Sequence, residues 1–129
     1  MLLIETYLDT SPGKGLGLFS KHDIAEGTIY WERNEIFDKI IAPLDLCSLN
    51  DLARAYIMHY ACLEKNNNWY LCGDNARFSN HSKDPNSKNE FGEDGLIRYH
   101  IVSRGIKAGE EIFCDYTELC QTCISGVSF

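Results

Sequence analysis

Two stretches of the sequence carry the residues best suited to chemistry. Residues 77–86 (RFSNHSKDPN) are rich in Asn, Ser, Asp and Pro. These side chains compete with the backbone for hydrogen bonds or fix its dihedral angles, so the segment is predicted to be a structured loop that can hold a polar ligand. Residues 110–116 (EEIFCDY) are apolar in the middle and would deliver the phenol of Tyr116 from the end of a buried strand.

The elements that position these stretches are predicted to be mostly short strands, at residues 2–8, 17–21, 28–31, 69–72, 96–104 and 111–116. Alternation within 96–104 places Ile97, Tyr99 and Ile101 on its buried face.

One helix is predicted, with Ser48 as its cap. Apolar residues from Leu49 to Ala61 recur at helical spacing and form one buried stripe. The strand–helix alternation of a dinucleotide-binding sheet is missing, so the predicted fold class is mainly β.

The bulk properties indicate one domain, residues 1–129, with an acidic balance. The net charge of −7 argues against nucleic acid as a partner. It favours a basic, lysine-containing protein, although it could equally serve solubility alone. No apolar run approaches the ~18 residues needed to cross a membrane, and no secretory leader is recognisable, so an intracellular location, cytoplasmic or nuclear, is expected.

With the turn Gly15-Leu16-Gly17 upstream, these two stretches resemble the signature motifs of the SET domain, the fold of many protein-lysine methyltransferases. The resemblance runs from about residue 5 to residue 116 and leaves residues 117–129 as a tail. It implies a SET-domain fold of several short-stranded sheets with one clear helix and a C-terminal pseudoknot, which brings the last strand beside Asn80 and His81. It also implies transfer of a methyl group from S-adenosylmethionine to a lysine of a protein substrate.

The resemblance assigns roles to individual residues. A glycine turn alone is more often structural, but in this family its main chain approaches the methionine part of the cofactor. The side chain of Asn80 is expected to accept a hydrogen bond from the cofactor's ammonium group, and main-chain groups of His81 to bind the adenine edge. Arg77 is expected to buttress the loop or the cofactor carboxylate, and the Asn-rich remainder of the loop to matter less. The cofactor-binding residues implied are Lys14, Gly15, Leu16, Gly17, Arg77, Asn80, His81 and Tyr116.

Tyr116 is the residue expected to be catalytic. A lysine amine has a pKa near 10.4, so its neutral form costs about 4.6 kcal/mol at pH 7, a cost that desolvation and a nearby sulfonium reduce. The remaining task is to align amine, methyl carbon and sulfur, and a phenol can do so without exchanging a proton. No metal is required. Taken alone, Tyr116 could equally be a core tyrosine, and Asp115 is expected to fix the loop end.

The substrate channel is where the sequence departs from the family. Lys83 stands where many relatives carry a zinc-binding cysteine, so a four-thiolate zinc site with Cys120 and Cys123 is not expected. The channel could be closed by the tail through Phe129, by a second subunit in a homodimer, or by the substrate. Trp31 is a candidate replacement for a channel tyrosine. Cys114 stands where many relatives have Phe or Tyr, which favours products with two or three methyl groups.

Two other classes of protein stay open. The chain could be a SET-fold module that binds a peptide or the cofactor without turnover. It could also be a thiol or metal protein built on Cys114, Cys120 and Cys123.

Overall fold

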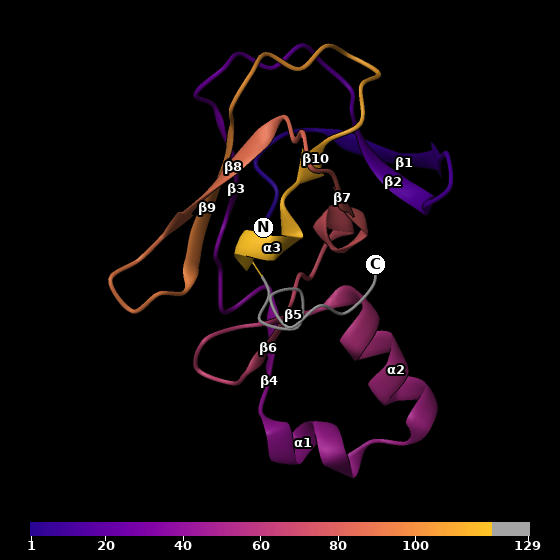
Figure 1. The fold of residues 1–129 in the computed structure, drawn as a ribbon, viewed down its shortest axis with the longest axis vertical. Coiled ribbons are helices and arrows are strands. Elements are labelled where there is room, and N and C mark those ends of the chain that lie inside the picture. The colour runs from indigo at the N-terminus through magenta and orange to yellow at the C-terminus, as the bar shows by residue number, and fades with distance from the viewer. Residues whose placement is uncertain (120–129) are drawn as a thin grey trace.

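The computed structural model describes residues 1–119, which form short strands and helices around one main hydrophobic core (Figure 1). The strands are β1 (Thr6–Ser11), β2 (Gly15–Ser20), β3 (Ile29–Glu32), β4 (Lys39–Ile41), β5 (Cys62–Leu63), β6 (Trp69–Leu71), β7 (Asn80–His81), β8 (Ser87–Phe91), β9 (Ile97–Val102) and β10 (Phe113–Cys114). The helices are α1 (Pro43–Ser48), α2 (Asp51–Tyr60), α3 (Tyr116–Leu119) and the 3₁₀ helix η1 (Asn75–Phe78). The predicted mainly β class is confirmed.

The first two strands form an antiparallel hairpin whose turn was predicted from its glycines. Gly13 and Gly15 have φ angles of 74° and 77°, in the left-handed region that favours glycine. The first strand was predicted to begin at residue 2 but begins at Thr6, because the start of the chain lies against another sheet, where Leu2 forms a single bridge with Trp31.

The central sheet has the order β3-β9-β8 and is antiparallel throughout. Consecutive residues of β8 pair with Ile97 and Tyr99, so Arg98 is an extra residue on β9. Such a bulge reverses which face the following side chains occupy. Tyr99 is therefore 37% exposed and His100 packs inward, so the prediction that Tyr99 shares the buried face with Ile97 is wrong.

A smaller sheet of order β4-β6-β5 lies with α1 and α2 at one end of the molecule (Figure 1). It has its own small core, made of Ile41, Leu46, Ala61 and Trp69.

The predicted helix corresponds to α2, but its start and its packing differ from the prediction. Asn50 is the cap, with its side-chain oxygen accepting from the amide of Ala53 at 2.9 Å, and Ser48 ends α1 instead. No residue of α2 is buried: Leu52 is 83% and Tyr56 43% exposed. The apolar stripe is therefore only partly covered, because the sheet beside it is small.

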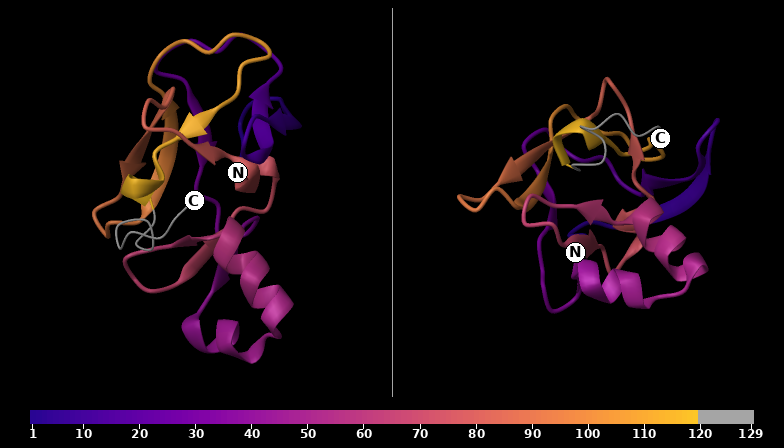
Figure 2. Two further views of the ribbon diagram at one scale, coloured as in Figure 1. Left: turned by 45° about the vertical axis from the view of Figure 1, so that its right-hand side comes forward. Right: turned by 60° about the horizontal axis from the view of Figure 1, so that its bottom comes forward.

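The last strand returns to the loop motif, as expected for the pseudoknot. β10 pairs in parallel with β7, placing Phe113 opposite Asn80 and Cys114 opposite His81 (Figure 2). The pairing is shorter than the predicted strand 111–116, and Tyr116 begins α3.

The main core lies between the hairpin, the central sheet and the last segment. The amide of Ile112 donates to the carbonyl of Leu18 at 2.8 Å and fixes this segment along β2. The core residues are Leu18, Ile24, Tyr30, Trp31, Tyr70, Ile97, Val102, Ile106 and Ile112.

No helix within residues 1–119 has the length and apolar character needed to cross a membrane.

Candidate active site

Tyr116 lies directly beside the loop motif and is held there by two hydrogen bonds. Its amide donates to Nδ1 of His81 at 3.0 Å, and its phenol donates to the carbonyl of Ser79. Its ring also lies against the imidazole of His81, with 5.5 Å between the ring centroids. Backbone and hydroxyl are thus both fixed, so the phenol oxygen has a defined position at the carbonyl of Ser79, within the loop motif.

The imidazole of His81 has a role that was not predicted from the sequence: it accepts a hydrogen bond from the backbone of Tyr116. Because its Nδ1 accepts from the amide of Tyr116, the proton of a neutral ring belongs on Nε2. The carboxylate of Asp115 is 3.8 Å from Nδ1, too far for a hydrogen bond. Asp115 instead accepts from the amide of Thr117 at 2.9 Å and turns the chain into α3, which agrees with the structural role expected for it.

The amide of Asn80 is oriented by two acceptors. Its Nδ2 donates to the carbonyl of Leu16 at 2.9 Å and to Oε2 of Glu111 at 2.9 Å. Its Oδ1 therefore faces the other way, and no donor within residues 1–119 bonds to it. An outward oxygen of this kind is suited to accept from an ammonium group, the role expected for Asn80.

The glycine turn forms the rim of the same site. Lys14, Gly15 and Leu16 are exposed, whereas Gly17 is buried beneath them. A Cβ on Gly17 would lie 2.5 Å from Oε2 of Glu111, so a side chain there would have to displace that carboxylate. The turn is therefore a rim of main chain and exposed side chains over a closely packed base, which fits the main-chain contacts expected for the cofactor.

Arg77 supports the loop from behind. Its Nε and Nη2 donate to the carbonyl of Cys72 at 3.1 and 2.8 Å, and its Nη1 donates to the hydroxyl of Tyr56 at 2.9 Å. Of the two roles expected for Arg77, these contacts match the buttress of the loop.

Asn86 does more than the sequence analysis expected of the Asn-rich part of the loop. It is 4% exposed, and its side chain donates to the carbonyl of Glu111 at 2.8 Å and accepts from the amide of Phe113 at 2.9 Å. Ser87 adds a bond from its hydroxyl to the carbonyl of Phe113 at 2.6 Å. These side-chain bonds thus hold β10 in place, in addition to its short two-residue pairing with β7. No local pattern in the sequence signals these bonds, because Asn86 lies 25 and 27 positions before its two partners.

The expected channel residues are brought together only in part. Trp31 is 1% exposed and packs against the rings of His100 and Tyr70, at centroid distances of 4.7 and 6.1 Å. This places it in the core, which does not support a channel wall. Cys114 is 3% exposed, with its Sγ 3.8 Å from the carbonyl oxygen of Asn80, and so lies against the loop motif. Phe129 lies outside the described residues.

Tyr30 is a residue near Cys114 that the sequence analysis did not single out. Burial raises the pKa of Tyr30 above its usual value, and the neighbouring thiol of Cys114 raises it further. Ser87 interacts with the same phenol. The bulge at Tyr30 explains the omission, because it breaks the alternation that would have separated its face from that of Trp31.

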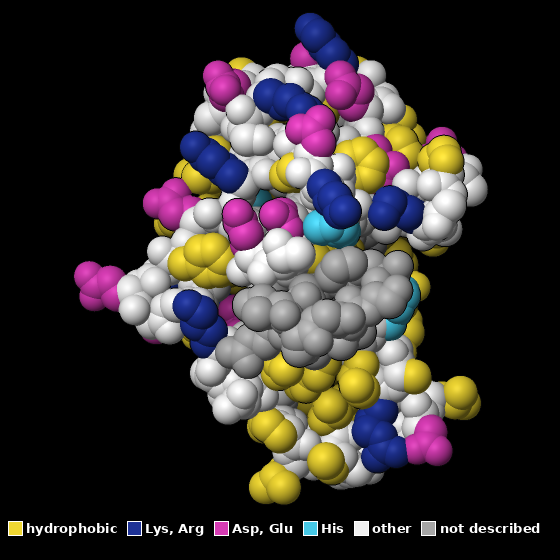
Figure 3. All heavy atoms as spheres, viewed as in Figure 1, with side chains coloured by type: hydrophobic (Ala, Val, Ile, Leu, Met, Phe, Trp, Pro, Cys, Tyr) yellow, Lys and Arg dark blue, Asp and Glu magenta, His cyan; other side chains and the backbone are white. Residues whose placement is uncertain are grey.

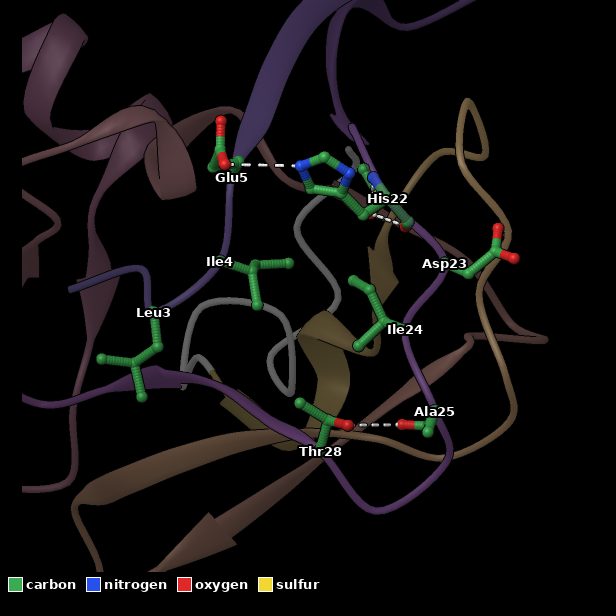
Figure 4. Close-up of a pocket in the computed structure, with 9 residues that line it drawn as sticks. Leu3, Ile4, Glu5, His22, Asp23, Ile24, Ala25 and Thr28 are labelled. Atoms are coloured by element: carbon green, nitrogen blue, oxygen red, sulfur yellow. Dashed lines mark hydrogen bonds and ion pairs between the residues drawn. The ribbon is translucent and has the colours of Figure 1, made fainter.

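A hollow lies away from these residues, between the chain before β1 and the segment that joins β2 to β3 (Figure 4). It has a volume of about 390 Å³, and Ile4 and Ile24 point toward each other across it. The ion pair of His22 and Glu5, 3.3 Å apart, lies at its edge. None of the expected site residues lines it. Within residues 1–119 no group of three or more His, Cys, Asp or Glu could hold a metal, and Cys120 and Cys123 lie outside the described part.

Comparison with known proteins identifies the family. The SET domain profile matches residues 15–117, so the chain belongs to the SET-domain family, and the resemblance seen in its motifs is confirmed. Compared with curated protein sequences, the chain has no significant match.

Two solved structures share the fold. A candidate histone methyltransferase from Plasmodium falciparum is 19% identical with a TM-score of 0.62, over 89% of this chain and 95% of that chain. A humanized mutant of the Chaetomium thermophilum Polycomb Repressive Complex 2, bound to the inhibitor GSK126, is 24% identical with a TM-score of 0.67, over 92% of this chain and 15% of that chain. At these identities the likeness shows the fold alone, which is of the SET methyltransferase type.

Proposed function

We propose that this protein transfers a methyl group from S-adenosylmethionine to the side-chain amine of a lysine in a protein substrate. One observation carries the proposal: the β7–β10 pairing brings Tyr116 to the loop motif, where its phenol is anchored on the carbonyl of Ser79, the residue before Asn80, whose amide is oriented by its own two acceptors. The amide oxygen of Asn80 can accept a hydrogen bond from the ammonium group of the cofactor, and the phenol of Tyr116 can orient the lysine amine. The methyl donor and the methyl acceptor therefore each have a partner in the same site.

The residues of this chain bind and orient the two reactants. S-adenosylmethionine, when bound, supplies a methyl group on a positive sulfur. Lys14, Gly15 and Leu16 would hold its methionine part from the turn, Asn80 would accept from its ammonium group, and main-chain groups of His81 would bind the adenine.

Tyr116 would orient the lysine amine without exchanging a proton. The phenol proton is donated to the carbonyl of Ser79, which keeps the hydroxyl in one direction. A fixed hydroxyl restricts the approach of the amine, and such positioning can contribute several kcal/mol to the rate. The amine loses its own proton more readily once it leaves water and faces a positive sulfur.

A basic protein segment is the proposed substrate, and the acidic net charge of the chain supports this choice. The net charge is −7, and acidic and basic side chains alternate over much of the face shown in Figure 3. Apolar side chains gather on the same face over α1 and α2, where Leu44 and Leu52 are 85% and 83% exposed. Because one structural neighbour is named a histone methyltransferase, histone tails are the first substrates to test. Such a substrate places the protein inside a cell, in the cytoplasm or nucleus.

A second candidate function is a SET-fold module that binds a ligand without turnover. The observation that favours it is the core position of Trp31, which leaves one expected wall of the lysine channel unfilled by that residue.

The proposal is tested by incubating the full chain with isotope-labelled S-adenosylmethionine and histone or other lysine-rich proteins, followed by mass spectrometry of the products. Label on lysine, strongly reduced in Asn80→Ala, is the expected result. Cofactor binding by calorimetry without any transferred label would instead favour the binding module.

A further inference from the structure

Glu111 is a polar residue of the site to which the sequence analysis gave no role. It precedes β10 and forms an isolated bridge with Phe19, so its backbone is fixed against β2. Its carboxylate reaches across the hairpin: Oε1 accepts from the hydroxyl of Ser11 at 2.7 Å, and Oε2 accepts from Nδ2 of Asn80 at 2.9 Å. One side chain therefore links the end of β1, the loop motif and the last segment.

The space for this carboxylate depends on Gly17. A Cβ at that position would lie 2.5 Å from Oε2 and 2.8 Å from Cδ of Glu111, and 3.1 Å from Nδ2 of Asn80. The carboxylate thus occupies the volume that a side chain at residue 17 would take.

The chemical consequence concerns the direction of the Asn80 amide. An asparagine amide can rotate by half a turn and exchange its donor end for its acceptor end. A carboxylate can only accept, and so can the carbonyl of Leu16. Both face the same end of the amide, so both require the NH₂ group there and turn Oδ1 outward.

We propose that Glu111 is a positioning residue that sets the Asn80 amide so that Oδ1 accepts from the ammonium group of S-adenosylmethionine. This rests on the proposed function, because it assigns the ammonium of that cofactor as the group recognised. Glu111 acts through Asn80. Its contribution is orientation, which a glutamine can reproduce: the amide oxygen of Gln accepts from Asn80, and its NH₂ donates to Ser11, whose hydroxyl rotates.

The test is calorimetric titration of the full chain with three probes. S-adenosylmethionine and S-adenosylhomocysteine carry the ammonium group, whereas 5′-methylthioadenosine has the adenosine and sulfur without it. Glu111→Ala is expected to weaken the first two by about 10- to 100-fold, the usual effect of a lost hydrogen bond to a charged group. The affinity of Glu111→Ala for 5′-methylthioadenosine stays within about threefold of that of the unmodified chain. This unchanged affinity also reports that the variant is folded. Glu111→Gln keeps most of the affinity for all three probes.

Two further variants keep the inference testable if Glu111→Ala does not fold. Ser11→Ala removes only the other anchor of the carboxylate and is expected to give a smaller loss with the same dependence on the probe. In an Asn80→Ala background, Ser11→Ala is expected to cause no additional loss, because its effect passes through Asn80.

The results that overturn the inference differ from those that overturn the proposed function. Equal weakening of all three probes in Glu111→Ala and Ser11→Ala means a general structural role, and unchanged affinity means no role; both overturn the inference alone. A Glu111→Gln variant as weak as Glu111→Ala shows that charge matters instead of orientation and also overturns it. Failure of the unmodified chain to bind any probe overturns the proposed function and, with it, the inference.

Discussion

The imidazole of His100 is half-buried against the main core, and we expect it to make the protein sensitive to mild acid. Its ring packs against Tyr30 and Trp31, with centroid distances of 5.8 and 4.7 Å. Its Nδ1 lies 2.8 Å from Oδ1 of Asn89, whose Nδ2 donates to Glu118, so Nδ1 carries the proton of the neutral ring. Burial and, to a smaller extent, the nearby ammonium of Met1 lower the pKa of His100 to about 3.

The sign and size of the effect follow from this shift. A histidine whose pKa is lower in the folded state binds a proton more readily after unfolding, so the folded state loses stability as the pH falls below about 6.5. With a folded pKa of about 3, the free energy of unfolding decreases by about 2 kcal/mol at most between pH 7 and pH 5. For a domain of this length, that corresponds to about 7 °C in the melting temperature.

The assay is urea unfolding at pH 7 and pH 5, compared between the unmodified chain and His100→Gln. The variant should be less stable at pH 7 but lose the acid-dependent part, so the difference between the two chains narrows at pH 5. His22→Gln, at an exposed histidine, is the matched control and should keep the full acid dependence. An identical pH dependence in His100→Gln and the unmodified chain would refute the reasoning.

Three other substitutions test neighbouring parts of the account. Gly17→Ala places a Cβ against Glu111, so we expect a loss of about 1–3 kcal/mol in unfolding free energy and weaker cofactor binding by calorimetry. Gly105→Ala is the control: its Cβ has no neighbour closer than 3.8 Å, so stability and binding should both stay unchanged. Arg33→Met removes the ion-pair partner of Glu64, whose side chain is 3% exposed, and should lower the free energy of unfolding in urea by about 3–5 kcal/mol. The double variant Arg33→Met/Glu64→Leu should recover much of this loss, and equal stability of the single and the double variant would contradict a buried ion pair. For Cys114, mass spectrometry should find lysine with two or three methyl groups from the unmodified chain and mainly one from Cys114→Tyr, and a monomethylated product from both would remove the argument from pocket size.

The sequence predicted the fold class and the location of the site better than it predicted the elements. The proximity of Asn80 and Tyr116 came from the family resemblance of two motifs, because no local pattern indicates that residues 33 positions apart pair in parallel. Strand β8 was missed because its sequence, SKNEF, is largely polar, and its pairing with β9 decides its structure.

The misplaced details have local physical causes. The bulge at Arg98 reverses the faces of β9, and a count of alternating residues cannot detect an inserted one. Asn50 and Ser48 are comparably good caps, so composition alone could not choose between them. The side-chain hydrogen bonds of Asn86 and Glu111 each join segments far apart in sequence. In the sequence these polar residues look like ordinary surface residues, because their partners become neighbours only in the folded chain.

The central claim is that Tyr116 orients a lysine for methyl transfer through its hydroxyl, and the most direct test removes that hydroxyl alone. The rate of methyl transfer to a lysine-rich protein should be measured for the unmodified chain and for Tyr116→Phe, at cofactor concentrations that saturate both by calorimetry. The account predicts that Tyr116→Phe remains folded and binds S-adenosylmethionine but loses most of its transfer rate. A Tyr116→Phe variant with full activity would contradict it.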